Sequence, residues 1–457
     1  MSISQILTTQ RDYFATGQTK SIAFRKKCLV RFRESVKSHE QDIIDALSAD
    51  FKKPPFESVA TEISIVMMEF NKAIKEIWKW QMPKKVSSSL LNFPSSDKIM
   101  YEPYGAILVI APWNYPFQLA LGPLVGAIAA GNTVVLKPSE LTPNTSTLLA
   151  KIITEVFDTG HVTVVQGDKE IAQKLLEQRW DYIFFTGSVS VGKIVYKAAA
   201  EYLTPVTLEL GGKSPCVIDE SAKIKLAAKR IVWGKFVNAG QTCIAPDYIL
   251  VHTAVKDQLL KALDIEITEA YGADPAISPD FARIINKKNF DRLSNMLEGA
   301  SIFKGGNTHR DTLYIAPTIL NDVTITDSAM QEEIFGPILP VLTYETKEDI
   351  SKIINTMEKP LSAYVFSEKR AFKNWFKHSF SFGGGAVNDT LVHFVNDKLP
   401  FGGVGHSGIG SYHGKKSFYT FSHAKSIVSR GTWIDIPVRY APYKSKISLI
   451  KKFINWL

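Results

Sequence analysis

Between residues 106 and 210, the sequence alternates short apolar runs with longer stretches of helical periodicity. The apolar runs, which we interpret as buried strands, span residues 106–111, 133–136, 162–165, 182–185 and 206–210. The stretches between them, which we interpret as helices, span residues 116–130, 143–157, 169–179 and 190–202. This alternation predicts βαβ units and a parallel sheet covered by helices on both faces. A second alternating set, from about residue 214 to 385, predicts a second domain of the same α/β class.

The regions that flank this alternation have different patterns. Two helical stretches, residues 21–50 and 57–80, precede it, and residues 85–102 carry short β-like pieces that predict an excursion or hairpin. The chain has 457 residues, which suggests two or three domains. Because no internal repeat or low-complexity linker separates these regions, we expect the domains to share tight interfaces.

Residues 103–136 contain no charged side chain and no histidine, which makes them the best candidate for a membrane span. Prolines and glycines divide this stretch into pieces that are too short to cross a bilayer as a helix. The N-terminal residues also lack the apolar segment of a secretory signal. We therefore expect a cytoplasmic protein.

Positive charge is concentrated at the C-terminal end of the chain. The net charge is +9, from 54 basic and 45 acidic residues. Residues 425–457 contain five Lys, two Arg and one Asp, so they hold +6 of that total. The rest of the chain is nearly neutral, and this excludes the clustered basic face of a nucleic-acid-binding protein.

Three cysteines, Cys28, Cys216 and Cys243, are too few and too scattered for a disulfide framework, which indicates a reducing compartment. Cys243 alone lies on a glycine-containing turn, in the sequence 238–243 between a helical run and a strand. A thiolate placed there could act as a nucleophile, although most free cysteines are inert core residues. The nine histidines lack metal-ligand spacing, so no metal site is predicted.

Glu209 is a lone carboxylate at the end of an apolar strand, just before Gly211 and Gly212. Burial would raise its pKa towards the value of a useful general base. The alternative is an edge strand with Glu209 in solvent. Asn114, between Trp113 and Tyr115 in a proline-bounded loop, could donate a hydrogen bond to an oxyanion. The two aromatic residues could equally be core.

Other polar residues follow predicted strands. Gly187 and Ser188 lie where a strand meets a helix, so they could bind a phosphate or simply cap that helix. Lys137 and Glu140 end a parallel strand, where ligands bind in open α/β sheets, although a solvated turn is equally consistent. The only G-x-G-x-x-G, residues 403–408, follows no apolar strand, so we interpret it as a glycine loop near a site and not as a dinucleotide fingerprint.

Seven segments together resemble the aldehyde dehydrogenase superfamily, in the order and spacing of that family. They are PWNYP (112–116), LKPSE (136–140), FTGS (185–188), LELGGKSP (208–215), GQTC (240–243), EEIFGP (332–337) and PFGGVGHSGIG (400–410). The short N-terminus and residues 439–443 resemble the class 3 branch, which includes fatty and aromatic aldehyde dehydrogenases. The resemblance covers nearly the whole chain.

The resemblance implies an enzyme that oxidises medium- or long-chain aliphatic or aromatic aldehydes to acids. Cys243 would be the nucleophile, Asn114 and the Cys243 backbone N–H would form the oxyanion hole, and Glu209 would be the general base for hydrolysis. A relative that passes the thioester to coenzyme A is the alternative enzyme, which the presence of Glu209 disfavours. A non-catalytic protein on the same fold is the alternative from another class.

The resemblance also implies a Rossmann-type cofactor site that works without G-x-G-x-x-G. Gly187 and Ser188 would lie by the pyrophosphate, Lys137 and Glu140 would hold the adenosine ribose, and Glu333 would hold the nicotinamide ribose. Phe335 would pack near the nicotinamide, and Trp113 and Gly192 complete the expected site. Glu140 should repel a 2′-phosphate and so favour NAD, although class 3 relatives often accept NADP as well. An apolar substrate pocket is expected from Tyr115, Trp233, Phe394 and Phe401.

The implied domains are a cofactor domain (1–82 and 103–207), a catalytic domain (208–388), a small β arm for oligomerisation (83–102 and 389–425) and a basic tail (426–457). Class 3 members are dimers, so we expect a homodimer held by this arm. In the tail, Ile447, Ile450, Phe453, Ile454 and Leu457 share one helical face with Lys444, Lys451 and Lys452 off it. This pattern predicts a helix that either contacts an anionic membrane surface, caps the chain's own substrate tunnel, or packs on a partner subunit.

Overall fold

The computed structural model describes residues 1–89, 92–444 and 446–455. The chain forms two compact units. The larger contains residues 1–80 and 103–423, and the smaller contains residues 81–102 and 424–457. Residues 389–423, which the sequence groups with the β arm, belong to the larger unit in the structure. The reason is that Phe401, Tyr412 and Phe418 are buried in it.

The first sheet of the larger unit has six strands in the order β17-β7-β6-β3-β4-β5. Their bounds are β3 Ala106–Ile110, β4 Thr133–Lys137, β5 Val162–Val164, β6 Tyr182–Thr186, β7 Val206–Glu209 and β17 Gly408–Ile409. The connecting helices are α6 Gln118–Ala130, α7 Pro143–Val156, α8 Lys169–Leu176 and α9 Val189–Ala200. All pairs of neighbours are parallel except β17 with β7. The predicted βαβ alternation is confirmed.

Strands β3 and β4 and helix α6 are buried along their whole length. A helix that is apolar all round has no solvent face, so it must lie inside the unit. This explains why residues 103–136 lack charge without spanning a membrane. No helix in the described part of the chain is long and apolar enough to cross a membrane.

The second sheet has seven strands in the order β10-β13-β14-β9-β8-β15-β16. Their bounds are β8 Pro215–Ile218, β9 Tyr248–His252, β10 Ile302–Lys304, β13 Thr318–Leu320, β14 Ile338–Tyr344, β15 Ser362–Phe366 and β16 Gly384–Val387. Its helices are α10 Ile224–Phe236, α11 Lys256–Tyr271, α12 Lys287–Asn295, α13 Ser328–Gln331, α14 Lys347–Asn355 and α15 Arg370–Ser379. Only β10 pairs antiparallel to its neighbour, and β11 Thr308–His309 and β12 Tyr314–Ile315 form a separate hairpin. The second predicted α/β set is therefore confirmed.

At the N-terminal end, helices pack mainly against α6 and α7, and the first of them contacts strands β3 and β4. These helices are α1 Ile3–Ala15, α2 Ile22–Ser38, α3 Glu40–Phe51, the short α4 Pro55–Glu57, the π-helical turn η2 Ser58–Ile63 and α5 Ser64–Trp80. The helical stretch predicted over residues 21–50 is present as two helices, α2 and α3. His39 has non-helical dihedral angles (φ −102°, ψ 18°) and ends α2 while it begins α3. Helix α16, Lys415–Thr420, packs against α6.

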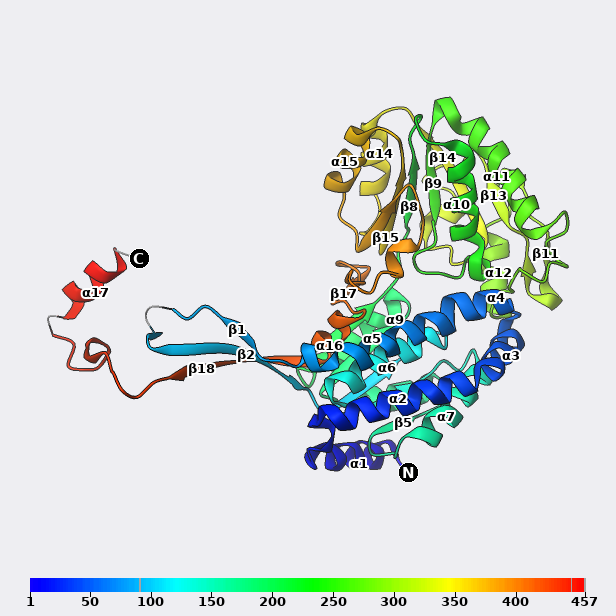
Figure 1. Ribbon diagram of the computed structural model, residues 1–457. Helices are drawn as coiled ribbons and strands as arrows, with labels where there is room; N and C mark the ends of the chain where they lie inside the picture. The colour runs from blue at the N-terminus through cyan, green and yellow to red at the C-terminus, as the bar shows by residue number, and fades with distance from the viewer. Residues whose placement is uncertain (90–91, 445, 456–457) are drawn as a thin grey trace. The chain divides into compact units, whose positions relative to one another are not determined.

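The smaller unit contains a three-stranded sheet in the order β1-β2-β18 (Figure 1). Strands β1 Lys84–Val86 and β2 Ser95–Pro103 are antiparallel, as the predicted hairpin requires, and β18 spans Ser422–Arg430. The Lys425 ammonium pairs with the Glu102 carboxylate, and the Phe93 ring meets Trp433 edge to face at 6.4 Å. The predicted tail helix is present as α17, Lys446–Ile454, while Leu457 and the side chain of Phe453 lie outside what the structure describes.

Candidate active site

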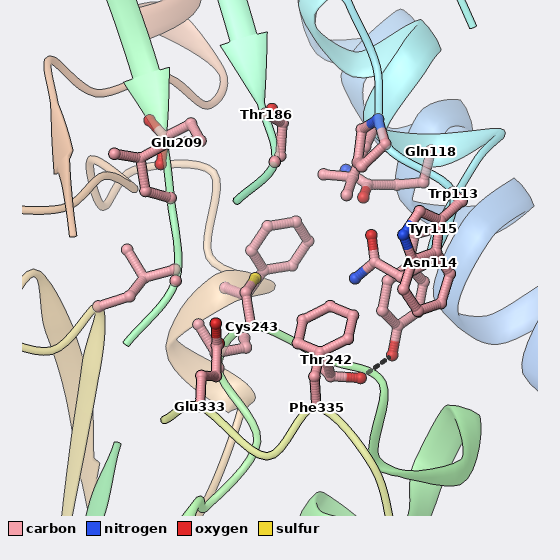
Figure 2. Close-up of a pocket in the computed structure, with 18 of the residues that line it drawn as sticks. Trp113, Asn114, Tyr115, Gln118, Thr186, Glu209, Thr242, Cys243, Glu333 and Phe335 are labelled. Atoms are coloured by element: carbon pink, nitrogen blue, oxygen red, sulfur yellow. Dashed lines mark hydrogen bonds between the residues drawn. The ribbon is translucent and has the colours of Figure 1, made fainter. Parts of the chain in front are cut away.

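A cavity of about 540 Å³ opens where the carboxyl ends of β3, β6 and β7 meet the loop before β9 (Figure 2). The three expected catalytic residues, Cys243, Glu209 and Asn114, all line it. Figure 2 shows the Cys243 side chain between Glu209 on one side and Asn114 on the other. The structure thus brings together side chains from three distant parts of the sequence.

Cys243 follows a tight left-handed turn. Asn238, Ala239 and Gly240 have φ values of 57°, 52° and 73°, which reverse the chain after α10. A Cβ on Gly240 would lie 2.3 Å from the carbonyl oxygen of Gly336, so no other residue fits there without movement. The turn leaves Cys243 partly exposed to the cavity, whereas Cys28 and Cys216 are buried. Desolvation of the sulfur atom, and then the nearby carboxylates Glu333 and Glu209, raise the pKa of the Cys243 thiol.

Gln241, in the same turn, has a structural role. Its amide donates to the carbonyl oxygens of Asn238 (3.1 Å) and Arg283 (3.0 Å), and its side-chain oxygen accepts the Ile285 N–H (3.0 Å). Its hydrogen-bonding groups are therefore committed to holding the loop, and they are not available to a substrate.

Asn114 is buried, with 3% of its surface exposed. Its amide nitrogen donates to the carbonyl oxygen of Gln241 at 3.0 Å, two residues before the cysteine. The neighbouring Tyr115 hydroxyl is hydrogen-bonded to Thr242 at 2.7 Å. The loop that carries Asn114 and the loop that carries Cys243 are therefore tied together at two points. Since an amide nitrogen has two hydrogens, one remains for an oxygen in the cavity.

Glu209 ends β7 and is 2% exposed, so the alternative of a solvent-exposed edge residue is wrong. The reason is strand β17, in which Gly408 pairs with Glu209 and covers the edge of β7. Within the described part of the chain, neither carboxylate oxygen has a hydrogen-bond partner. Burial raises the pKa of Glu209 well above its usual range. A carboxyl group in this state can take a proton near neutral pH.

Five of the expected cofactor residues line the same cavity: Trp113, Gly187, Ser188, Glu333 and Phe335. Ser188 caps helix α9, so the free N–H groups of that helix terminus face an incoming anion. Burial and the Asp247 charge raise the pKa of Glu333 to about 8. A Cβ on Gly211 would lie 2.1 Å from the Glu333 carboxylate, so the glycine makes room for it. The Trp113 and Phe335 rings meet edge to face at 5.3 Å.

Three expected cofactor residues do not line the cavity. Lys137 and Glu140 form an ion pair of 2.7 Å at the end of β4. Gly192 lies inside α9, where a Cβ would be 2.6 Å from a methyl group of Leu210, so this glycine lets the helix pack closely on the sheet. A helix terminus and two carboxylates, Glu140 and Glu333, are groups that suit the phosphates and ribose hydroxyls of a dinucleotide.

The rest of the cavity wall is mostly apolar. It contains all four expected pocket residues, Tyr115, Trp233, Phe394 and Phe401. Further apolar residues that the sequence did not single out also line it, namely Ile65, Leu119, Val237, Leu391, Val395 and Tyr412. They come from helices and loops far apart in the chain, where an apolar residue cannot be distinguished from core by its local pattern.

Arg292, on α12, is a polar residue that the sequence analysis missed. Its guanidinium donates to the carbonyl oxygens of Glu333 (3.4 Å) and Ile334 (2.7 Å) and pairs with Glu332 at 3.2 Å. It therefore holds the loop that presents Glu333. No motif surrounds Arg292, so only its position in the fold reveals this contact.

The model of the aldehyde dehydrogenase family matches residues 2–427. The chain belongs to the aldehyde dehydrogenase family. A Staphylococcus aureus relative, 4,4′-diaponeurosporen-aldehyde dehydrogenase, is 50% identical over 99% of each chain. A dog relative described as a dimeric, NADP-preferring aldehyde dehydrogenase is 42% identical over 98% of this chain and 99% of its own. This aldehyde dehydrogenase is thus an oxidoreductase that converts aldehydes to carboxylic acids with NAD or NADP.

A solved structure of S. aureus AldH in a substrate-bound state matches this aldehyde dehydrogenase with a TM-score of 0.97 and 50% sequence identity. The match covers 99% of this chain and all of the other. The fold class expected from the sequence is therefore confirmed.

Proposed function

We propose that this aldehyde dehydrogenase oxidises apolar aldehydes through a covalent thioester on Cys243. The observation that carries the proposal is the meeting of a partly exposed thiol, a buried amide donor and an unpartnered buried carboxylate in one apolar-walled cavity. Each group alone has an ordinary structural explanation. Their arrangement around one point is what acyl chemistry on a thiol requires.

In the first half-reaction, the Cys243 sulfur attacks the aldehyde carbon, and the carbonyl π electrons move to the oxygen. The Asn114 amide and the Cys243 backbone N–H donate to that oxyanion, and such a donor typically contributes about 3–4 kcal/mol to transition-state binding. The carbon then loses a hydride as its C=O bond re-forms, which leaves a thioester. When bound, NAD(P)⁺ supplies a positive charge that favours the Cys243 thiolate, and also the acceptor for this hydride.

In the second half-reaction, Glu209 accepts a proton from a water molecule as the water oxygen attacks the thioester carbon. The same donors hold the oxyanion. The C–S bond then breaks, which releases the carboxylic acid and returns the thiolate of Cys243, and the proton on Glu209 passes to solvent. The absence of hydrogen-bond partners on Glu209 in the described chain supports this role, because both oxygens remain free to bind water.

The proposed cofactor site divides between the two ends of the dinucleotide. The terminus of α9, with Gly187 and Ser188, would bind the pyrophosphate, and Lys137 and Glu140 the adenosine ribose. Glu333 would accept from the nicotinamide ribose, with Phe335 and Trp113 packed beside the ring and Gly192 keeping α9 close to the sheet. The Glu140 carboxylate favours NAD, because it would repel the 2′-phosphate of NADP. NADP would be used less efficiently.

Apolar walls favour apolar substrates. The proposed substrates are medium- or long-chain aliphatic, aromatic or polyene aldehydes, since the pocket rings Tyr115, Trp233, Phe394 and Phe401 offer few polar partners. The name of the S. aureus relative refers to 4,4′-diaponeurosporen-aldehyde as its substrate.

The decisive assay follows absorbance at 340 nm with NAD or NADP and aldehydes from acetaldehyde to hexadecanal, with benzaldehyde and retinal. Cys243→Ser should abolish turnover, and Cys28→Ser, in a buried thiol outside the cavity, should preserve it. Turnover should rise with the length of the aldehyde. Turnover that requires coenzyme A would support the acylating alternative, and no turnover with either cofactor would overturn the proposal.

The C-terminal helix α17 is proposed as a peripheral membrane contact of a cytoplasmic enzyme. Ile447, Ile450 and Ile454 are exposed on it, beside Lys451 and Lys452. The full chain should sediment with anionic vesicles, and both a chain ending at Tyr443 and a Lys451→Glu/Lys452→Glu variant should not. Equal sedimentation of all three would remove the membrane role. A raised aldehyde KM in the shortened chain would support a cap on the tunnel instead.

A homodimer is proposed to form through the small unit. Strand β18 is mostly exposed and lies at one edge of the β1-β2-β18 sheet, and an exposed edge strand can pair with another chain. Light scattering should give twice the chain mass of 50.9 kDa. A proline in the exposed part of β18, such as Val428→Pro, should shift the protein towards monomer.

A further inference from the structure

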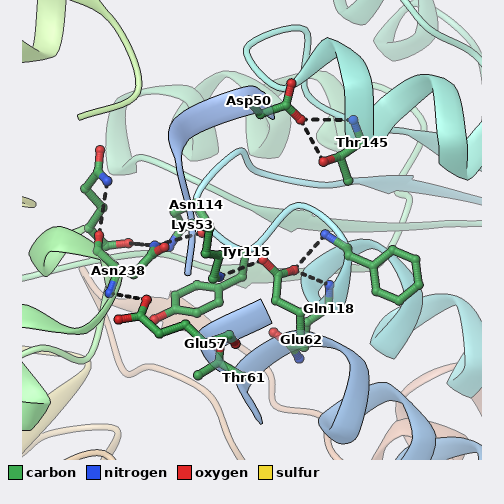
Figure 3. Close-up of polar contacts among 12 residues, drawn as sticks. Asp50, Lys53, Glu57, Thr61, Glu62, Asn114, Tyr115, Gln118, Thr145 and Asn238 are labelled. Carbon is green, nitrogen blue, oxygen red and sulfur yellow. Dashed lines mark hydrogen bonds and ion pairs between the residues drawn. The ribbon is translucent and has the colours of Figure 1, made fainter. Parts of the chain in front are cut away.

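Residues 50–62 carry three charged side chains that are buried against loops of the active site (Figure 3). Lys53 lies just before α4, Glu57 ends α4, and Glu62 lies in the π-helical turn η2. Lys53 and Glu62 have no exposed surface, and Glu57 is 9% exposed. None of the three was singled out from the sequence, and none lines the cavity.

Glu62 holds the loop that carries Asn114. One carboxylate oxygen accepts the Lys53 ammonium at 2.7 Å, and the other accepts the backbone N–H groups of Phe117 (2.9 Å) and Gln118 (3.0 Å). These N–H groups belong to the first turn of α6, whose own N-cap residue makes no side-chain capping bond. Glu62 therefore caps α6 from another element, three residues beyond Asn114.

Glu57 holds the loop that carries Cys243. Its carboxylate accepts the backbone N–H of Asn238 at 2.9 Å, inside the left-handed turn. The Asn238 amide in turn donates to the carbonyl oxygens of Asn114 (2.8 Å) and Gln241 (3.2 Å). Glu57 thus fixes the residue that joins both loops.

Lys53 pairs with Glu62 and lies against an aromatic ring of the site, and the charge of nearby Glu57 also acts on its ammonium. Its ammonium lies 3.9 Å from the centre of the Tyr115 ring, and the Tyr115 hydroxyl is bonded to Thr242, next to the cysteine. Burial lowers the pKa of Lys53 and raises that of Glu57 to about 7. Burial of charged groups costs desolvation free energy. Well-packed apolar residues at these three positions would therefore stabilise the fold as well or better.

We propose that Lys53, Glu57 and Glu62 form a brace of positioning residues that sets the Asn114 amide relative to the Cys243 sulfur. The brace rests on the proposed function, because it acts through the oxyanion hole that Asn114 and Cys243 form. It touches neither substrate nor cofactor. Its contribution is geometric, since a donor must lie where the oxyanion develops and a small displacement loses the interaction.

The test uses two substitutions of similar size at one position. Glu57→Gln keeps a side-chain oxygen that can accept the Asn238 N–H, whereas Glu57→Leu removes the acceptor. We expect Glu57→Gln to retain kcat/KM for the aldehyde within about threefold, and Glu57→Leu to lose at least about tenfold, a size expected when a catalytic donor is misplaced. The NADH burst rate and the steady rate should fall together, because both half-reactions form an oxyanion.

A second readout separates positioning from general damage. In alkylation by iodoacetamide, the Cys243 sulfur displaces iodide from a saturated carbon of the reagent, and no oxyanion forms. The rate of alkylation should therefore stay within about twofold of wild type in both Glu57 variants. Asp219→Asn, in a buried carboxylate bonded to Ser367 at 2.9 Å outside the cavity, controls for loss of stability alone. Glu62→Gln keeps the size but has only one acceptor oxygen, so its NH2 group must face either the Lys53 ammonium or the two backbone N–H groups of α6. It gives an independent arm with the same expected loss.

Two results would overturn the brace. In the first, Glu57→Leu and Glu62→Gln keep wild-type kcat/KM at a temperature where they are folded. In the second, turnover and alkylation fall by the same factor, as general damage would cause. Failure of the proposed function looks different, because Cys243→Ser would then keep its turnover. If the proposed function is right and the brace is not, Cys243→Ser will be inactive and Glu62→Gln will be fully active.

Discussion

The active-site carboxylate Glu209 and the brace both consist of buried ionisable side chains, but they differ in their hydrogen-bond partners. The brace residues are Lys53, Glu57 and Glu62. Glu209 has no hydrogen-bond partner in the described part of the chain. Glu62 accepts three hydrogen bonds, and Glu57 accepts one from the turn before Cys243. The difference teaches that a buried carboxylate without partners keeps both oxygens free for water, whereas one with partners holds other groups in place.

The largest effect is expected from Glu209→Gln, which removes the proton acceptor and keeps the size. The first NADH burst, about one per site, should remain fast because water has not yet attacked. Steady turnover should fall by roughly 10²–10⁴-fold, the usual contribution of a general base. Rapid-mixing absorbance at 340 nm separates the two phases, and steady turnover equal to wild type would show that Glu209 is not the base.

Asn114→Ala should have the next largest effect, and on both phases. Removal of one oxyanion donor typically lowers the rate by about 10²–10³-fold. The burst amplitude should stay near one per site while its rate falls, because the same thioester still forms. If Asn114→Ala slowed only the steady phase, Asn114 would act in hydrolysis, as Glu209 does, and not as an oxyanion donor in both half-reactions.

The sequence predicted much of this arrangement. Cys243, Glu209 and Asn114 stand in short motifs with strong local character. The alternation from 106 to 210 places the strand before Asn114 and the strand that ends at Glu209 in one sheet, whereas Cys243 precedes β9 of the second sheet. The brace was not predictable in the same way. Lys53, Glu57 and Glu62 look like the solvated face of a charged helix, and their burial depends on how α3, η2 and α6 pack.

The sequence failed to predict three other features for the same reason. They are the break at His39, the burial of residues 389–423 and the contacts of Arg292. Each depends on contacts between residues far apart in the chain. Local periodicity can show that a helix or strand is present, but it cannot show which polar side chain will be covered when elements pack. The edge position of β7 was open in the sequence because its neighbour, β17, is only two residues long.

Glu57 also makes a prediction about stability and pH. Its pKa rises from 4.5 to about 7 on folding, so between these values the unfolded chain has lost the proton that the folded chain keeps. Raising the pH through this window therefore destabilises the folded state, by up to roughly 3 kcal/mol in total, and the loss is complete above pH 7. Glu57→Gln does not titrate, so its free energy of unfolding relative to wild type should rise from pH 4.5 to 7 and then level off. Urea unfolding at pH 5, 6, 7 and 8 measures this, and parallel curves for the two proteins would contradict it.

The smallest effect is expected at a paired, half-exposed carboxylate. Glu140 bonds to Lys137 at 2.7 Å and is 42% exposed in its side chain. Glu140→Gln removes the charge that would repel a 2′-phosphate, so the ratio of kcat/KM for NADP over NAD should rise by about three- to tenfold, or roughly 1 kcal/mol. Initial rates with each cofactor at a fixed aldehyde concentration give the ratio. An unchanged ratio would mean that another group selects the cofactor.

Strand β17 pairs with β7 only late in the synthesis of the chain. Residues 206–209 leave the ribosome long before residues 408–409, which pair with them and close the sheet. At about 5–20 residues per second, β7 keeps an open edge for about 10–40 s of synthesis. An unpaired apolar strand is a template for pairing with other chains. The step that buries the proposed base is therefore also the step that ends this exposure, so a weakened β17 should appear first as poor yield of folded protein and only then as poor catalysis.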